Sequence, residues 1–335
     1  MQLEETDMYS YIDMHCDTLW SYMDAGYEQL YENQGMQSIK LMQEASQLCQ
    51  FFAVFFPAKN TEVVDMYTPK KPMPADEVYF EKLRKNLLQV VEAHPELIAM
   101  AYSANDIVEN QKKGRMSAVL TMEDGRMIQG SMKNLQKVYE AGVRVIGLTW
   151  NHANCFGYPN AIDAAKMSLG LTDFGKEAVE EMNCLGILTD VSHLSDGGFW
   201  DVINISKKPI IASHSNCRAI SPHPRNLTDD MIRAVAEKGG VIGVNLYAPF
   251  VRPDMQNARY EIDALVLHVK HLMQIGGEDC VGIGSDFDGM DGDLLIDNPV
   301  KMQLLWDALE QEGLSHRQIQ KIAQGNVLRV LQDTI

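Results

Sequence analysis

Residues 11–20 read YIDMHCDTLW, a short apolar run that contains two metal-binding residue types. The first residues predict a β-strand that ends at His15, and Asp17 follows two positions later. Successive side chains of a strand alternate between its faces, so His15 and Asp17 point the same way. An imidazole and a carboxylate at this spacing suit a divalent metal such as zinc. Taken alone, however, the pair is more often a core histidine and a capping aspartate at a strand end.

Seven more short apolar runs suited to strands follow, and most are succeeded by a helical pattern. The predicted strands cover residues 48–56, 117–122, 143–150, 186–191, 209–213, 241–246 and 281–285. Predicted helices cover residues 75–93, 172–184, 229–238, 262–275, 300–311 and 315–331, and one more helix ends over 135–141. Thr172 or Asp173 is the expected cap of the helix over 172–184.

Strands that alternate with helices indicate a parallel sheet. Eight such units in 335 residues predict an α/β fold of the (β/α)8 TIM-barrel type, as a single domain over residues 1–335. An open doubly wound sheet is the alternative. No G-x-G-x-x-G follows any predicted strand to support a dinucleotide site in such a sheet.

The composition fits a soluble enzyme that acts on a small molecule, but it does not select one. The net charge of −17 argues against nucleic acid or an anionic membrane surface as the main partner. Residues 1–11 are acidic and lack the apolar segment of a secretory signal, and the apolar run 51–58 is too short to span a bilayer. The six cysteines are scattered without a C-x-x-C pair, as in proteins with reduced thiols. We therefore expect a cytoplasmic protein, with a homodimer as one possible assembly.

Residue types with metal-binding or acid–base chemistry recur at the carboxyl ends of the predicted strands. They are His15, Asp17, Glu123, His193, His214 and Asp286. Each has a structural explanation when taken alone, but active sites of (β/α)8 barrels form at these strand ends. Three imidazoles and three carboxylates exceed what one tetrahedral zinc needs. They predict two metal ions bridged by a carboxylate and a hydroxide, a centre suited to amide hydrolysis.

The motifs around these residues resemble the membrane (renal) dipeptidases, peptidase family M19 of the amidohydrolase superfamily. The matching segments, which share order and spacing with the family between Asp13 and Leu331, are IDMHCDTLW, TMEDG, LTDVSH, IIASHSNCRAI, HPRNLTDD, GIGSDFDG and QGNVLRVL. The resemblance implies a (β/α)8 barrel that hydrolyses the peptide bond of dipeptides, with L-Xaa-D-Xaa substrates among those tolerated.

The resemblance also implies a cofactor of two zinc ions per subunit. His15 and Asp17 would hold one ion, and His193 and His214 the other. Glu123 would bridge both ions and so belong to the catalytic centre. The hydroxide between the ions would attack the scissile carbonyl.

Three further roles are implied by the resemblance. Asp286 would be the general acid/base that moves a proton to the leaving amine, while Asp288 would shape the turn. Arg225 would clamp the substrate carboxylate, because a guanidinium fork binds both oxygens. Where the family has a histidine in an L-T-H segment, this chain has Trp150, and His152 is the candidate to contact substrate in its place.

That departure at Trp150 keeps two alternatives open. One is a related amidohydrolase that acts on an N-acyl amino acid or a lactone. The other is a barrel that keeps its metal ions but serves as a non-catalytic binding protein, which the ligand set and Asp286 argue against.

Overall fold

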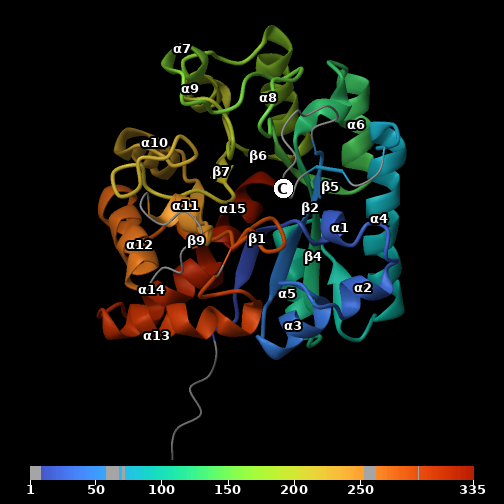
Figure 1. The fold of residues 1–335 in the computed structure, drawn as a ribbon, viewed down its shortest axis with the longest axis vertical. Helices are drawn as coiled ribbons and strands as arrows, with labels where there is room; N and C mark the ends of the chain where they lie inside the picture. Colours follow the sequence, from blue (N-terminus) through green and yellow to red (C-terminus); the bar gives the residue numbers. More distant parts are fainter. Residues whose placement is uncertain (1–8, 58–67, 70–71, 253–261, 293) are drawn as a thin grey trace, which may run out of the picture.

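A computed structural model describes residues 9–57, 68–69, 72–252, 262–292 and 294–335 of the chain. Strands occupy the middle of the molecule and helices surround them (Figure 1). Residues 1–8, which belong to the segment expected to lack a secretory signal, lie outside the described residues. Among those described, no helix combines the length and apolar character needed to cross a bilayer.

Eight parallel strands of the described chain close into a barrel. They are β1 (Ile12–Cys16), β2 (Cys49–Phe55), β4 (Met116–Glu123), β5 (Val143–Gly147), β6 (Leu188–Asp190), β7 (Ile211–Ala212), β8 (Val241–Val244) and β9 (Val281–Ile283). The ring runs β2-β1-β9-β8-β7-β6-β5-β4, and the pairing of β2 with β4 closes it. The predicted (β/α)8 barrel is therefore confirmed. One domain over residues 1–335 stays a prediction.

One strand lies outside this ring and was absent from the sequence prediction. The short β3 (Ile98–Met100) pairs in parallel with the beginning of β4, from Met116 to Ala118. The partner β5 joins β4 only from Leu120 onward, so β3 occupies the stretch of β4 that β5 does not reach. A run of three residues is too short to be recognised by its periodicity.

The major helices lie where the sequence predicts them. They are α4 (Asp76–Ala93), α6 (Met132–Glu140), α8 (Asp173–Leu185), α10 (Asp229–Glu237), α12 (Ile262–Gly276) and α13 (Gln303–Gln311). The predicted cap of α8 is also present, because Thr172 Oγ1 accepts a hydrogen bond of 2.9 Å from Gly175 N. The predicted final helix is α14 (His316–Gln320), a π-helical turn (Lys321–Gly325) and α15 (Asn326–Thr334).

Several helices were not predicted. Two longer ones are α5 (Ala104–Lys112) and α9 (Asp196–Ile205). Short ones are α1 (Thr18–Ser21), α7 (Ala164–Met167) and α11 (Ala248–Val251), with a 3-10 turn at Gly125–Ile128. The segment after Trp20, expected to be helical or loop up to about residue 41, contains α2 (Glu28–Tyr31) and the beginning of α3 (Ile39–Glu44). A 3-10 turn at Pro299–Met302 begins the predicted helix over 300–311. Most of these lie in the connections between barrel strands.

The interior of the barrel is tightly filled below the strand ends. Met14 from β1 and Val327 from α15 belong to the same buried cluster as residues of six other strands. Gly243 of β8 faces this interior: a Cβ there would lie 2.0 Å from the Ser213 carbonyl oxygen and 2.8 Å from Met14 Cε. Only a residue without a side chain lets β7 and β8 approach this closely.

We expect Gly243→Ala to lower the free energy of unfolding by about 1–3 kcal/mol, because the added methyl group meets backbone that cannot rotate away. Gly147→Ala in β5 is the matched control, since its Cβ would meet its nearest neighbour at 3.4 Å, an ordinary contact. Urea denaturation of both variants measures the difference. Equal losses of stability would contradict the argument.

Candidate metal centre

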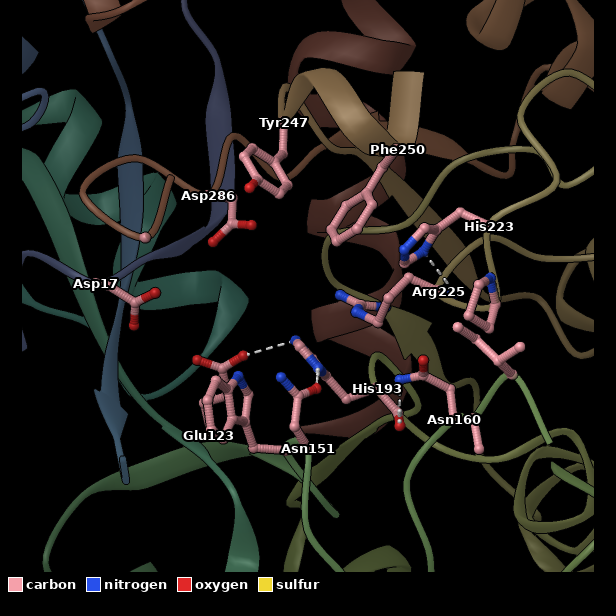
Figure 2. A pocket seen from close by; sticks show the side chains of 15 residues that line it. Asp17, Glu123, Asn151, Asn160, His193, His223, Arg225, Tyr247, Phe250 and Asp286 are labelled. Carbon is pink, nitrogen blue, oxygen red and sulfur yellow. Dashed lines mark hydrogen bonds and ion pairs between the residues drawn. The ribbon is translucent and has the colours of Figure 1, made fainter. Parts of the chain in front are cut away.

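The barrel brings all six predicted residues to one rim. Each lies at or just after the carboxyl end of a strand and is buried: His15, Asp17, Glu123, His193, His214 and Asp286. Figure 2 shows the carboxyl groups of Asp17, Glu123 and Asp286 directed into one open space. The residues come from both ends of the sequence, so only the closed barrel makes them neighbours.

The first group of donor atoms comes from His15, Asp17 and Glu123, whose ligand atoms lie within 4.8 Å of one another. His15 Nε2 is 3.7 Å from Asp17 Oδ2 and 3.4 Å from Glu123 Oε2. Within the described residues, His15 Nε2, Asp17 Oδ1 and Glu123 Oε2 are buried without a hydrogen-bond partner. Buried polar atoms without partners are unfavourable, and a cation between these three would satisfy them.

The second group comes from Glu123, His193 and His214. Glu123 Oε1 is 3.0 Å from His193 Nε2 and 3.5 Å from His214 Nε2, and the two ring nitrogens are 3.1 Å apart. Burial lowers the pKa of both imidazoles well below the usual range, so both rings are neutral. Neutral imidazole nitrogen and carboxylate oxygen are ligands of zinc, so this group also fits a divalent cation.

The electrostatics of the rim favour a positive charge. Burial alone would lower the pKa of His15, but the Glu123 and Asp17 carboxylates raise it well above the usual range. Burial raises the pKa of Glu123 to about 7, with Asp17 adding to the rise and His15 and Arg225 opposing it. Acidic groups crowded out of water in this way are stabilised by a bound cation.

Asp286 forms a third group of donor atoms with His15 and His214. Its Oδ1 is 3.8 Å from His15 Nε2, and its Oδ2 accepts a hydrogen bond of 3.0 Å from Asn245 Nδ2. Burial raises the pKa of Asp286 to about 8, and the charges of Asp17 and Glu123 add to this rise while His15 opposes it. This carboxyl group therefore holds a proton at neutral pH, unlike an ordinary aspartate.

Two of these residues have backbone conformations that side chains rarely adopt. His193 has φ 66° and Asp286 has φ 68°, both in the left-handed region. Asn160 holds His193 in place, since its backbone N and its Nδ2 donate to the His193 carbonyl at 2.7 and 3.0 Å. Strained backbone of this kind persists where its surroundings fix it, and it concentrates at functional sites.

The turn after Asp286 has a glycine for a steric reason. A Cβ at Gly289 would lie 2.1 Å from Asp17 Oδ2 and 2.6 Å from Asp286 Oδ1. Asp288, predicted to shape this turn, has φ 63° and accepts hydrogen bonds from Thr18 Oγ1 at 2.7 Å and Met36 N at 2.8 Å. Asp288 thus ties the turn to neighbouring loops, and it belongs to none of the donor groups found among the described residues.

A cavity of about 390 Å³ opens over the donor groups. Across it from Asp17 lie Arg225, His223, Tyr247 and Phe250 (Figure 2). Arg225 is buried, its Nη2 donates to the His214 carbonyl at 3.1 Å, and its guanidinium carbon lies 5.4 Å from the Phe250 ring centroid. A cation thus faces the acidic rim across a space large enough for a small molecule.

The two residues predicted near the departure from the family motif differ in burial, although their ring centroids lie only 5.8 Å apart. Trp150 lines the cavity, is buried, and packs edge-on against Phe55 with ring centroids 4.8 Å apart. His152 is exposed and is not among the residues that line the cavity in the described chain. Asn151 lies at the cavity instead, with its Oδ1 3.0 Å from His193 Nδ1.

Several residues at the site were not singled out from the sequence. They are Asn151, Asn160, His223, Asn245, Tyr247 and Phe250. Asn151 directly follows the predicted strand over 143–150 and Asn245 lies near the end of the predicted strand over 241–246, and these positions were the available indication. Asn160, His223 and Phe250 lie in long connections where the sequence does not reveal which side chains face the rim.

Known proteins resemble this chain in sequence and in fold. The family model described as membrane dipeptidase (peptidase family M19) matches residues 6–334, so the chain belongs to this family. By that membership it is a metallo-dipeptidase.

Three relatives are described here. A metallo peptidase from Rhodobacter sphaeroides, in a crystal structure with a phosphinate mimic of the dipeptide L-Ala-D-Ala, has 26% identity and a TM-score of 0.90, covering 98% of this chain and 100% of that one. An uncharacterized dipeptidase of Schizosaccharomyces pombe is 30% identical over 85% of this chain and 69% of its own length. An uncharacterized protein from the pqqA 5′ region of Klebsiella pneumoniae is 34% identical over 74% and 93%.

Glu123→Gln tests whether one carboxylate serves both donor groups. Loss of an outer-shell partner alone weakens metal binding about 10–100-fold. Because Glu123 would contact the ions directly, we expect this change to lower the affinity for both ions by more than about 100-fold. Metal content after dialysis against a chelator, determined by mass spectrometry, measures the effect. Asp288→Asn, at a neighbouring, partly buried acid outside the donor groups, should keep both ions. Two ions retained in Glu123→Gln would exclude the shared role.

Proposed function

We propose that this chain is a zinc-dependent dipeptidase that hydrolyses the single peptide bond of a dipeptide. The observation that carries the proposal is the position of Glu123. Its Oε2 faces His15 Nε2 at 3.4 Å, while its Oε1 faces His193 Nε2 at 3.0 Å. One carboxylate between two groups of donor atoms is the arrangement that a pair of metal ions requires.

We assign one ion to His15 and Asp17, a second ion to His193 and His214, and Glu123 to both. Once bound, two divalent ions supply Lewis acidity toward a carbonyl oxygen and lower the pKa of water. The donor set fits zinc because it consists of imidazole nitrogen and carboxylate oxygen.

Asp286 is the proposed general acid/base. Without bound ions, burial and the charges of Asp17 and Glu123 raise its pKa to about 8, and as the acid it would release a proton to a leaving amine. The hydrogen bond from Asn245 Nδ2 fixes Oδ2, and Oδ1 remains on the side of His15. The carboxyl group is therefore held at the edge of the donor groups, where the scissile bond would lie.

Arg225 is the proposed clamp for the substrate carboxylate. A planar guanidinium binds both oxygens of a carboxylate at once. Trp150 supplies an apolar wall of the same cavity. A contact of His152 with the substrate stays a prediction: its side chain is exposed and does not line the cavity within the described residues, but its ring lies 5.8 Å from that of Trp150.

A D-amino acid in the second position is part of the proposal. A clamp that reads the carboxylate is indifferent to the side chain beside it. The related Rhodobacter sphaeroides metallo peptidase, crystallised with a mimic of L-Ala-D-Ala, supports this choice.

The partner and location follow the same proposal. We propose a dipeptide as the small-molecule partner, with neither nucleic acid nor a membrane surface, and a cytoplasmic homodimer. The net charge of −17 argues against nucleic acid or an anionic membrane surface as a partner. The six cysteines, which all lie within the described residues, are free, and this supports a reducing compartment.

We expect zinc-loaded protein to hydrolyse both L-Ala-L-Ala and L-Ala-D-Ala, because both carry the free carboxylate that Arg225 would bind. N-acetyl-L-alanine and a lactone complete the panel, and release of free amino acid or ring-opened acid is measured. Turnover of those two compounds but of neither dipeptide would favour the related amidohydrolase. Two bound ions with no turnover at all would favour a non-catalytic barrel.

Asp286→Asn separates proton transfer from metal binding. The amide preserves shape but carries no acidic proton, so we expect kcat to fall by about 10²–10⁴ while bound zinc stays near the wild-type level. Steady-state kinetics and metal content are measured on the same preparation. Near-normal turnover would remove Asp286 from the general acid/base role.

A further inference from the structure

We propose that Asp190 and Ser213 form a relay that fixes the ring of His214 with its Nε2 directed toward the metal centre. This inference rests on the proposed function for its purpose, but its geometry is independent of any substrate. Neither residue touches the cavity, so both are positioning residues.

The relay joins the ends of two neighbouring strands. Asp190 is the last residue of β6 and pairs in register with Ile211 of β7. Its Oδ1 accepts hydrogen bonds of 2.9 Å from Ser192 N and 2.9 Å from Ser213 N. Its Oδ2 lies 2.5 Å from Ser213 Oγ, and Ser213 Oγ lies 2.8 Å from His214 Nδ1. All of these groups are buried.

The direction of each hydrogen bond follows from the number of protons available. A carboxylate only accepts, so Ser213 donates its single hydroxyl proton to Asp190. Ser213 Oγ can then meet His214 Nδ1 only as an acceptor, and the ring proton must reside on Nδ1. His214 Nε2 therefore presents its lone pair to the centre, 3.5 Å from Glu123 Oε1 and 3.1 Å from His193 Nε2.

The two histidines of this donor group are supported differently. His193 Nδ1 faces the neutral amide oxygen of Asn151 at 3.0 Å, whereas His214 is backed through Ser213 by a full negative charge. Carboxylate support raises the basicity of a ligating imidazole. We therefore infer that His214 is the stronger donor of the pair.

The chain contains a second aspartate–serine pair that lacks the histidine ring. Ser285 N and Oγ donate to Asp13 Oδ1 and Oδ2 at 2.8 and 2.5 Å, joining the ends of β9 and β1. Ser285 Oγ also contacts the His15 carbonyl at 3.3 Å and accepts a hydrogen bond of 3.1 Å from Phe287 N. The pair therefore serves to join strands without an imidazole, and it separates the structural role from the relay.

The first test compares Ser213→Ala with Ser285→Ala, because each variant removes a buried hydrogen bond from a serine hydroxyl to an aspartate carboxylate. Chelator competition with zinc measures the affinity of each ion in the full chain. We expect Ser213→Ala to lower the affinity for the ion assigned to His193 and His214 about 10–100-fold. Ser285→Ala should lower the affinity for that ion clearly less. Equal effects of the two variants, or none in Ser213→Ala, would overturn the relay.

The second test reads the tautomer directly and does not depend on activity. Nitrogen-15 NMR of the histidine rings in metal-free protein at neutral pH, assigned with His214→Gln, should show the His214 proton on Nδ1. Ser213→Ala should shift that ring signal, while Ser285→Ala should leave it in place. A proton on Nε2 in the wild-type protein would contradict the proposal. If dipeptides are not hydrolysed but this pattern holds, only the proposed function fails.

Discussion

The parallel pairing of β2 with β4 is the contact on which the rest of the structure depends. Its register runs from Cys49 opposite Ser117 to Phe55 opposite Glu123, and it closes the barrel. Because every strand of the ring is parallel, closure places all carboxyl ends on one rim. The last pair of this register also sets the height of Glu123, which then lies between histidines delivered by β1 and by the segments after β6 and β7.

Closure also creates the electrostatic problem that defines the site. Three carboxyl groups and three imidazoles meet in a buried mouth, and burial opposes every charge among them. The pKa of Asp286 rises to about 8 and that of Glu123 to about 7, because each acid is withdrawn from water and faces other acids. A cation between the groups relieves both effects, so the chemistry of the donor set and the energetics of the fold point to the same occupant.

The barrel could be predicted from the sequence because its strands are continuous apolar runs, and most of them are followed by a helical pattern. The lengths were less predictable: the run over 209–213 forms only the two-residue strand Ile211–Ala212, since hydrogen bonding to its neighbours sets where a strand ends. The strand β3 escaped prediction because three residues show no period. The metal-binding residue types were recognisable because histidine and acidic residues are uncommon at the ends of buried strands.

The residues that support the histidine ligands could not be predicted from the sequence, for a different reason. Asparagine and serine are ordinary in loops, and the function of Asn151 or Ser213 exists only through the ring nitrogen that each faces. Asn151 and His152, which are adjacent in the sequence, illustrate this. His152 has the more suggestive chemistry, but its ring lies beside Trp150 at 5.8 Å, while Asn151 contacts His193. Side-chain direction in an irregular loop is set by tertiary contacts, with no period from which to predict it.

The support of each ligand by a neighbouring strand explains how a strained site stays ordered. His193 follows β6 with φ 66°, and its carbonyl is held by Asn160 from the connection after β5. His214 follows β7, and its ring is held by Ser213, which is anchored to Asp190 of β6. His193 is thus fixed by a residue from another connection, and His214 is fixed through its neighbour Ser213, which is anchored to the adjacent strand. A ligand held across a strand boundary moves only if the barrel itself deforms, and tight packing in the barrel interior opposes that movement.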